Sequence, residues 1–216
     1  MLTVEKIFDM TANNYKKTEE VKFKDYTEIT ISNTKRYLKP TDEILDYGCA
    51  TGTKTLSLAG CVNKITAIDI SSKMIELAKQ KITDHENEKI KFLHTSIFDE
   101  RFTHNYFDVV MVFNILHLVE NDNQVIERIT DILKPGGLLI STTPCLAEKM
   151  TLENRIKFFP VRLLMSIKLF PSLKKYRFTE VENLLQSNRL KIVEAKKYFE
   201  RLSSYFLVAS KIEDKK

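Results

Sequence analysis

Cysteine is scarce in this chain. Its three cysteines, Cys49, Cys61 and Cys145, are odd in number and lie far apart. Zinc sites and redox dithiols commonly use closely spaced pairs such as Cys-x-x-Cys, and the sequence contains no such pair. Reduced thiols of this kind are typical of cytoplasmic proteins. We therefore expect a cytoplasmic chain without a metal site.

Long apolar runs are also missing. The longest uncharged apolar run near the middle of the chain, residues 109–119, is too short to cross a bilayer. Near the N-terminus, Glu5, Lys6 and Asp9 occupy the place where a secretion signal needs its apolar segment. We expect neither secretion nor a transmembrane anchor.

Neither sign of charge dominates, because 34 Lys and Arg against 29 Asp and Glu leave a net charge of +5 over 216 residues. This surplus does not indicate nucleic-acid binding by itself, since such proteins usually concentrate Lys and Arg on one face. Apolar residues make up 43% of the chain, enough to bury a sizeable core. The composition predicts an ordinary globular domain.

Glycine is rare too, with five in the whole chain. Three of them, Gly48, Gly52 and Gly60, follow one apolar run, and Gly136 and Gly137 precede another. This placement indicates glycines that serve specific turns.

Short β-type runs alternate with helical segments from residue 43 onward. The predicted strands are 44–47, 64–70, 90–93, 107–113, 138–142, 190–198 and 204–211, and the predicted helices are 53–59, 71–82 (with Ser71 or Ser72 as N-cap), 125–133 and 178–186. Strands separated by helices imply right-handed crossovers and a parallel sheet. The last two strands have only a short connection and should pair antiparallel. We expect an α/β fold, a Rossmann-like, mostly parallel seven-stranded sheet with helices on both faces.

The chain divides into four parts within one domain, 1–216. Residues 1–42 form an N-terminal cap with two predicted helices, although β-branched residues in the second disfavour a helix there. Residues 43–143 form the core. Residues 145–177 are an insertion too long for a plain connection, and residues 178–216 carry the last helix and the antiparallel pair.

The clearest motif is the run Asp46-Tyr47-Gly48-Cys49-Ala50-Thr51-Gly52, where a strand ends in a glycine-rich turn and a helix begins. Such a turn brings backbone N–H groups close to a ligand at the carboxyl edge of a parallel sheet. Asp69 ends the second strand, 21 residues after Gly48, where a carboxylate accepts hydrogen bonds from ribose hydroxyls. Ala50 and Thr53 replace two glycines of the dinucleotide fingerprint, and no Gly-Lys-Ser/Thr follows for a Walker A loop. We expect an adenosine-type ligand.

These residues resemble the motif D-x-G-x-(G/A)-x-G of the class I S-adenosylmethionine-dependent methyltransferases. The resemblance extends over residues 43–143, through Asp69-Ile70, Thr95-Ser96-Ile97, the run from Tyr106 to His117 and the turn Lys134-Pro135-Gly136-Gly137. Within this family the chain is most similar to the small-molecule group that includes the ubiquinone/menaquinone methyltransferases. Ser96 stands where the family commonly has Asp, so its contact with the adenine should be weaker.

The resemblance implies S-adenosylmethionine as the cofactor and S-adenosylhomocysteine as its product. The residues that it places at the cofactor are Tyr15, Asp46, Gly48, Cys49, Ala50, Gly52, Asp69, Ile70, Ser96, Ile97 and Asn114. Asp46 is also suited to holding the loop, and Cys49 to giving it shape, because no neighbouring base would activate the thiol.

His117 is the candidate catalytic residue. Histidine titrates near neutrality, and this position follows the fourth strand, beside the expected methyl group. The alternative is a histidine that serves packing or the start of a helix. Methyl transfer from a sulfonium mainly requires alignment of the acceptor and exclusion of water, so a base is optional.

The insertion is both basic and apolar. Residues 149–177 contain eight Lys or Arg against one Glu, a net charge of +7, so the other 187 residues sum to −2. One interpretation is a lid helix over the acceptor pocket, whose apolar side chains pack on the domain while its charged groups stay in water. A second is contact with an anionic or lipid-like acceptor, or with an anionic membrane surface. Nucleic acid is not expected, because no RNA-binding module is visible.

The function predicted from the sequence is methyl transfer to a small-molecule acceptor, hydrophobic or anionic, by a monomer or homodimer. The alternatives are a non-catalytic cofactor-binding scaffold or membrane-associated protein, a nicotinamide-dependent oxidoreductase and an RNA methyltransferase.

Overall fold

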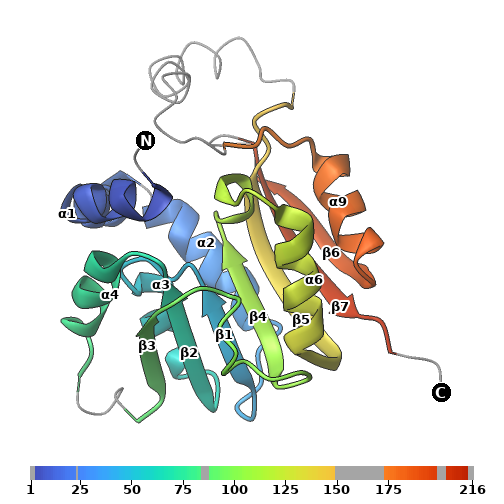
Figure 1. Cartoon of the computed structure of the whole chain (residues 1–216), viewed down its shortest axis with the longest axis horizontal. Coiled ribbons are helices and arrows are strands. Elements are labelled where there is room, and N and C mark those ends of the chain that lie inside the picture. Colours follow the sequence, from blue (N-terminus) through green and yellow to red (C-terminus); the bar gives the residue numbers. More distant parts are fainter. Residues whose placement is uncertain (1–2, 23, 84–87, 149–172, 199–202, 214–216) are drawn as a thin grey trace.

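A seven-stranded sheet with helices on both faces forms the body of the protein (Figure 1). The structure is a computed structural model, and it describes residues 3–22, 24–83, 88–148, 173–198 and 203–213. In chain order the elements are α1 (Val4–Lys22), α2 (Lys24–Lys35), β1 (Glu43–Tyr47), α3 (Thr53–Ala59), β2 (Lys64–Asp69), α4 (Ser72–Lys79), β3 (Ile90–His94), β4 (Phe107–Phe113), the 3₁₀ helix η1 (Leu116–Leu118), α6 (Asp122–Ile132), β5 (Leu133–Pro144), α9 (Phe178–Ser187), β6 (Leu190–Tyr198) and β7 (Ser204–Lys211).

The strand order is β3-β2-β1-β4-β5-β7-β6. The neighbours from β3 to β5 pair in parallel, while β7 runs antiparallel to both β5 and β6. The predicted fold class is therefore confirmed. β2, β1 and β4 are parallel neighbours, so their carboxyl ends meet at one edge of the sheet. The strand order reverses between β1 and β4, and α/β folds bind ligands at such a point.

The fifth strand differs from its prediction. It begins at Leu133, directly after α6, and not at Leu138. The expected turn at residues 134–137 lies inside the strand, because the pairing register shifts from Phe107↔Leu133 to Val109↔Leu138 and absorbs the additional residues. Gly136 takes the positive φ of 73° that this irregularity requires.

The helix after β2 is shorter than predicted and ends at Lys79, not Ile82. Its start agrees with the prediction, because Ser71 is the N-cap and its hydroxyl accepts the Met74 N–H at 3.1 Å. Both N-terminal helices are present. In α2, the hydroxyls of Thr30 and Thr34 bond back to the carbonyls of Tyr26 and Thr30, which satisfies these threonines inside a helix.

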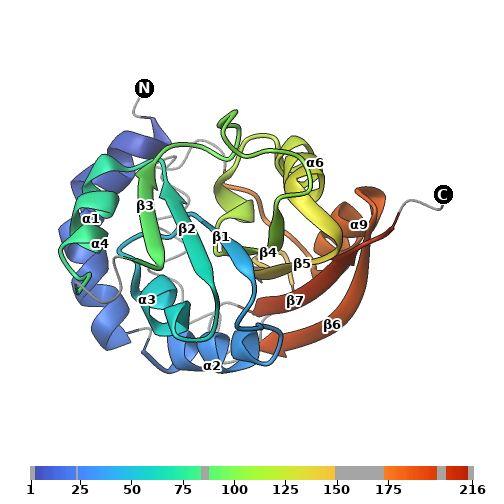
Figure 2. The same cartoon turned by 90° about the horizontal axis from the view of Figure 1, so that it is seen from below.

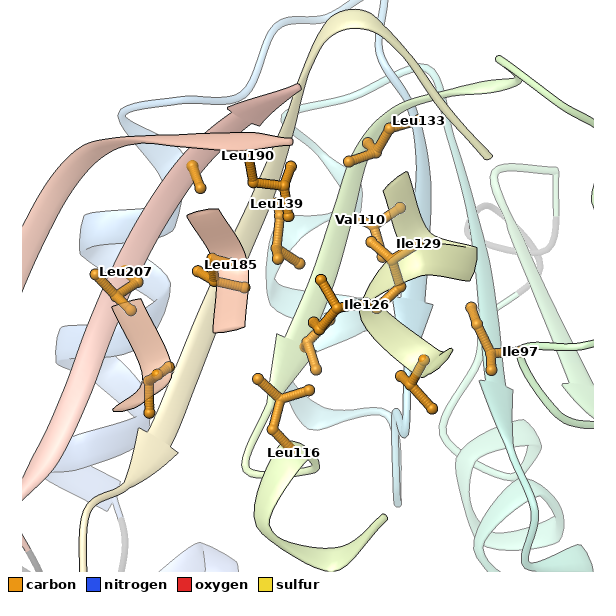
Figure 3. Close-up of a cluster of buried hydrophobic side chains, with 14 of the residues drawn as sticks. Ile97, Val110, Leu116, Ile126, Ile129, Leu133, Leu139, Leu185, Leu190 and Leu207 are labelled. Atoms are coloured by element: carbon orange, nitrogen blue, oxygen red, sulfur yellow. The ribbon is translucent and has the colours of Figure 1, made fainter. Parts of the chain in front are cut away.

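Two apolar cores hold the helices to the sheet. Figure 3 shows the larger one, where side chains of α6 and α9 meet one face of β4, β5 and β7; its labelled members are Ile97, Val110, Leu116, Ile126, Ile129, Leu133, Leu139, Leu185, Leu190 and Leu207. On the other face, α2, α3 and α4 cover β1, β2 and β4 (Figure 2). Burial on both faces explains why β4 is almost wholly apolar. In the part of the chain that the structure describes, no helix has the length and apolar character needed to span a membrane.

Candidate cofactor site

The loop after β1 has an unusual backbone. Gly48, Ala50 and Gly52 all have positive φ, at 74°, 49° and 74°. The N–H groups of Gly48 and Cys49 donate to the carbonyl of Ile68 in the neighbouring strand, at 2.8 and 3.0 Å. These bonds hold the start of the loop against β2, the strand that ends in Asp69.

Glycine is required in this loop for space as well as for φ. A Cβ on Gly48 would lie 2.2 Å from Cδ1 of Ile115, and a Cβ on Gly52 would lie 2.7 Å from the ring of Phe92. The loop therefore lies directly against the segment after β4 and against β3. Both glycines of the predicted motif are explained by this close packing.

Asp69 lies against the same loop. One carboxylate oxygen accepts the Ala50 N–H at 3.0 Å and the other accepts the Ser71 N–H at 2.8 Å. The carboxylate is only 8% exposed, and burial raises its pKa even though the two N–H donors favour the charged form. Next to it, Ile70 leaves 36% of its surface exposed. A carboxylate and an apolar surface thus adjoin the glycine-rich turn.

Asp46 has a structural partner inside the protein. It is 2% exposed, and its carboxylate accepts the Thr55 hydroxyl at 2.6 Å, which ties β1 to α3. Cys49 is buried beside it. Burial and the carboxylates of Asp46 and Asp69 raise the pKa of the Cys49 thiol well above its ordinary value. This thiol is protonated at neutral pH, which agrees with a role in shape alone.

The loop after β3 contributes mainly backbone. The Ser96 hydroxyl accepts the Phe98 N–H at 3.3 Å, so it already has a partner within its own turn. The side chain of Ile97 is buried in the larger core (Figure 3). Only the backbone of Ile97, not its side chain, is therefore available to a ligand at this edge.

Asn114 ends β4 in the left-handed region, with φ of 59°. Its N–H donates to the carbonyl of Thr142 at 2.8 Å. Its side-chain oxygen accepts the Tyr26 hydroxyl at 3.1 Å and the Thr142 hydroxyl at 3.4 Å. Burial raises the pKa of Tyr26, so the phenol stays protonated. The next residue, Ile115, is the one that packs on Gly48.

His117 lies in η1 and is 7% exposed. Burial lowers its pKa to about 4, so the imidazole is neutral at pH 7. Its Nδ1 has no hydrogen-bond partner among the described residues. The carbonyl of His117 accepts the Lys174 N–H at 2.8 Å. The end of the insertion therefore docks on the candidate catalytic residue.

The described ends of the insertion lie together. The Ala147 N–H donates to the carbonyl of Tyr176 at 3.0 Å, and Lys174 forms an ion pair with Asp122 at 2.6 Å. Tyr176 also donates to Asp122. Residues 149–172, which include most of the predicted lid, lie outside the described residues.

Tyr15 lies on α1, which packs against α4 and the loop. Phe8, Ala12 and Tyr15 form a small apolar cluster with Ala50, Met74 and Leu77. Figures 1 and 2 both show α1 alongside α4. Tyr15 and Ala50 thus pack against the same cluster of Ala12, Met74 and Leu77.

Three further residues join this region from outside the motif. Tyr26 contacts Asn114, Asp9 contacts Ser71, and Ser71 contacts Asp69. Only Ser71 had a sequence signal, as an N-cap. In the described parts of the chain no three His, Cys, Asp or Glu residues are grouped as a metal site would require.

The fold and the site define a Rossmann-like protein whose glycine-rich turn and strand-end carboxylate fit an adenosine-type ligand. A family model described as a methyltransferase domain matches residues 38–196. The chain belongs to this family, the class I S-adenosylmethionine-dependent methyltransferases.

Among curated relatives, the demethylmenaquinone methyltransferase of Bacillus mycoides (strain KBAB4) is 32% identical over 106 residues. That match covers 48% of this chain and 45% of the relative, so the chain matches about half the length of this relative.

Two solved structures share the fold. The N-methyltransferase NodS from Bradyrhizobium japonicum WM9, in complex with S-adenosylhomocysteine, gives a TM-score of 0.66 at 19% identity and covers 88% of this chain and 87% of NodS. The [4+2]-cyclase SpnF gives a TM-score of 0.68 at 16% identity and covers 88% of this chain and 81% of SpnF. A cyclase on the same fold means that the fold alone does not specify methyl transfer.

Proposed function

We propose that this chain transfers the methyl group of S-adenosylmethionine to a small-molecule acceptor by in-line displacement. The observation that carries the proposal is the 3.0 Å contact between the Asp69 carboxylate and the Ala50 N–H. This contact places the strand-end carboxylate directly against the glycine-rich turn. A carboxylate beside a glycine-rich turn is the arrangement expected of an adenosine site, and it supports the proposal.

The residues present suit the cofactor in chemical type. Asp69 would accept the ribose hydroxyls, and the exposed surface of Ile70 would lie beside the adenine. The backbone around Ser96 and Ile97 would meet the adenine edge. The turn from Gly48 to Gly52 lies at the carboxyl end of β1, where its backbone would meet the rest of the cofactor.

When bound, S-adenosylmethionine supplies an electrophilic methyl group on a sulfonium. The chain then has to align the acceptor and exclude water. Asn114, fixed by Tyr26 and Thr142, would hold the methionine part on the side of β4. Tyr15 on α1, which packs against the same cluster as Ala50, would cover the opposite side.

His117 is proposed as a general base for acceptors that must lose a proton. Its Nδ1 has no hydrogen-bond partner among the described residues, and the imidazole is neutral at pH 7. The same burial that lowers the pKa weakens the imidazole as a base, so the proposal rests on the position of His117 after β4 and on its unpaired Nδ1. Replacement by Gln should then lower kcat at least tenfold and leave the Kd for S-adenosylhomocysteine unchanged. Equal kcat values for the two proteins would assign His117 to packing.

We propose that the acceptor is hydrophobic, of the quinone type named in the demethylmenaquinone methyltransferases. The composition of residues 149–177, basic and apolar, supports this class of acceptor. The C-terminal described end of the insertion contacts His117 through the Lys174 N–H, and His117 is where we place the approach of the acceptor to the methyl group. Turnover assays with a demethylated quinone, a small hydroxylated aromatic and a small amine would distinguish acceptor classes.

A thermal-shift titration tests cofactor binding. A ligand at 100 times its Kd stabilises the folded state by about 2.7 kcal/mol. For a chain of this size this raises Tm by roughly 5–10 °C. Asp69→Ala should remove most of the shift that S-adenosylhomocysteine produces. Asp25→Ala, on the exposed side of α2, should keep it. An unchanged melting curve for the unaltered protein would reject the proposal.

The same titration separates the alternatives. A larger shift with NAD than with S-adenosylhomocysteine would indicate an oxidoreductase. Binding of S-adenosylhomocysteine without turnover of any acceptor class would favour a scaffold. Co-sedimentation with anionic vesicles, before and after replacing Arg155, Lys157 and Arg162 by Gln, would test contact between the insertion and a membrane surface.

A further inference from the structure

Helix α1 covers the cofactor loop through a short run of apolar residues. Ala12 forms a cluster with Met74 and Leu77 of α4, and Phe8, Tyr15 and Ala50 pack against this cluster. This cluster is small compared with the two cores of the sheet. Its apolar contacts alone are a weak means of fixing a helix, since the gain scales with the area removed from water. A directional contact is needed to set the position of α1.

Asp9 supplies such a contact, in addition to the 3.7 Å contact between Glu5 of α1 and His94. The Oδ1 of Asp9 accepts the Ser71 hydroxyl at 2.6 Å and the Lys73 N–H at 3.2 Å. Both donors belong to the start of α4, where backbone N–H groups lack partners within the helix. A carboxylate is favoured there by charge-assisted hydrogen bonds and by the helix dipole. Asp9 therefore fastens α1 to the N-terminus of α4.

Ser71 connects this fastening to the adenosine site. Its hydroxyl donates to Asp9, and its N–H donates to Asp69 at 2.8 Å. The other oxygen of Asp69 accepts the Ala50 N–H. One chain of hydrogen bonds thus runs from α1 through Ser71 and Asp69 to the glycine-rich turn, where Ala50 packs against the same cluster as α1.

We propose that Asp9 is a positioning residue of the cofactor site, which holds α1 and Tyr15 over the turn through Ser71 and Lys73. The proposal rests on the proposed function, because it assumes that S-adenosylmethionine binds at Asp69. It adds a residue from the N-terminal cap to a site otherwise built from strand ends.

Asp9 also acts on the charge of Asp69. The charged groups that act on Asp69 are Asp9 from α1 and His94 from β3. Tyr47 and Cys49, from β1 and its loop, also face Asp69, and its carboxylate raises the pKa of both. Burial is the main cause of the raised pKa of Asp69; the Asp9 carboxylate raises it further, and His94 opposes this. Removal of the Asp9 charge should therefore lower the pKa of Asp69.

Calorimetric titration with S-adenosylhomocysteine tests the proposal on the full chain. Asp9→Ala should raise the Kd about tenfold, because α1 loses this directional contact, while the Tm without ligand changes little. Asp9→Asn keeps an acceptor oxygen and should bind with nearly unaltered affinity at pH 7. As the pH is lowered, however, the affinity of Asp9→Asn for S-adenosylhomocysteine should be lost at a lower pH than that of the unaltered chain, because Asp69 stays ionised there. Asp25→Asn, an exposed acid on α2, is the matched control.

The outcomes separate the two proposals. If the unaltered chain binds and Asp9→Ala binds equally well, the role of Asp9 is wrong and the proposed function stands. If the unaltered chain does not bind S-adenosylhomocysteine, both are wrong. Should Asp9→Ala fail to fold, Asp9→Asn decides, because an acid limit of binding identical to that of the unaltered chain would contradict the coupling to Asp69. Faster hydrogen exchange in α1 of Asp9→Ala would support the role of Asp9 in holding this helix.

Discussion

The hydroxyl of Tyr26, in α2, donates a 3.1 Å hydrogen bond to the side-chain oxygen of Asn114, the residue that follows β4. The two residues are 88 positions apart in the chain. The bond links the N-terminal cap to the strand end that carries Ile115, the residue packed on Gly48. Helix α2 thereby helps to define the shape of the loop that we assign to the cofactor.

Tyr26→Phe should destabilise the protein and weaken the cofactor site. The variant removes the phenol donor from the partly buried side-chain oxygen of Asn114, which keeps the longer contact with Thr142, a change that costs about 1 kcal/mol. Urea unfolding would measure this loss, and the Kd for S-adenosylhomocysteine should rise several-fold because Asn114 is less well fixed. Tyr106→Phe, at an exposed ring, is the control and should change neither quantity. Equal effects of the two variants would contradict this role of Tyr26.

Gly48→Ala should abolish cofactor binding. The new methyl group would lie 2.2 Å from Cδ1 of Ile115, and the position also requires φ of 74°. Gly60→Ala is the matched control, because a Cβ there meets nothing within 4 Å and φ is −67°. It should retain binding and be neutral or slightly stabilising, by up to about 1 kcal/mol.

Combining Gly48→Ala with Ile115→Ala would separate the two causes. The double variant removes the clash but keeps the strain of a positive φ. We expect partial recovery of stability in urea unfolding. Full recovery would show that only the space beside Ile115 matters at this position.

His117 should make the protein sensitive to acid. Burial lowers its folded-state pKa from 6.5 to about 4, so the folded form disfavours the proton. The resulting stability is fully present above pH 6.5 and is lost as pH falls towards 4. A shift of this size corresponds to about 3 kcal/mol. Urea unfolding of His117→Gln between pH 4 and 7 should show a flatter pH dependence than that of the unaltered chain. Parallel curves would contradict the burial of a neutral imidazole.

Thr55→Val should loosen α3 from β1. The Thr55 hydroxyl donates to the buried Asp46 carboxylate at 2.6 Å, and hydrogen bonds to charged groups contribute about 1.5–3 kcal/mol. Valine has nearly the same shape, so the loss in urea unfolding should report mainly the hydrogen bond. Thr55→Ser keeps the hydroxyl and should restore most of the stability. A valine variant as stable as the unaltered chain would show that other partners satisfy Asp46.

The alternation of apolar runs was sufficient to predict the fold, because each parallel strand and its crossover helix follow one another in the chain. The start of β5 was not predictable, since a register shift against Phe107 and Val109 absorbs a sequence that otherwise signals a turn. The end of α4 at Lys79 is a similar case. Helix ends depend on contacts that periodicity does not record.

The candidate site likewise has residues that the sequence predicts and residues that it does not. Gly48, Gly52 and Asp69 follow directly from strand ends, so their meeting could be inferred from spacing alone. Asp9 and Tyr26 lie on helices whose docking depends on tertiary packing, and neither belongs to a motif. For Ser96 and Ile97 the sequence indicated the right loop. The hydrogen bond from the Phe98 N–H to Ser96 and the burial of the Ile97 side chain depend on the local fold and could not be predicted from the motif.

The hydrogen bond between Ala147 and Tyr176 joins the two described ends of the insertion. This bond involves only these two residues, and its geometry does not depend on how many residues separate them. The entropic cost of closing such a loop grows slowly, by about 0.6 kcal/mol for each doubling of its length. Changes in length between these two residues should therefore cost little free energy of folding and leave the cofactor loop unchanged.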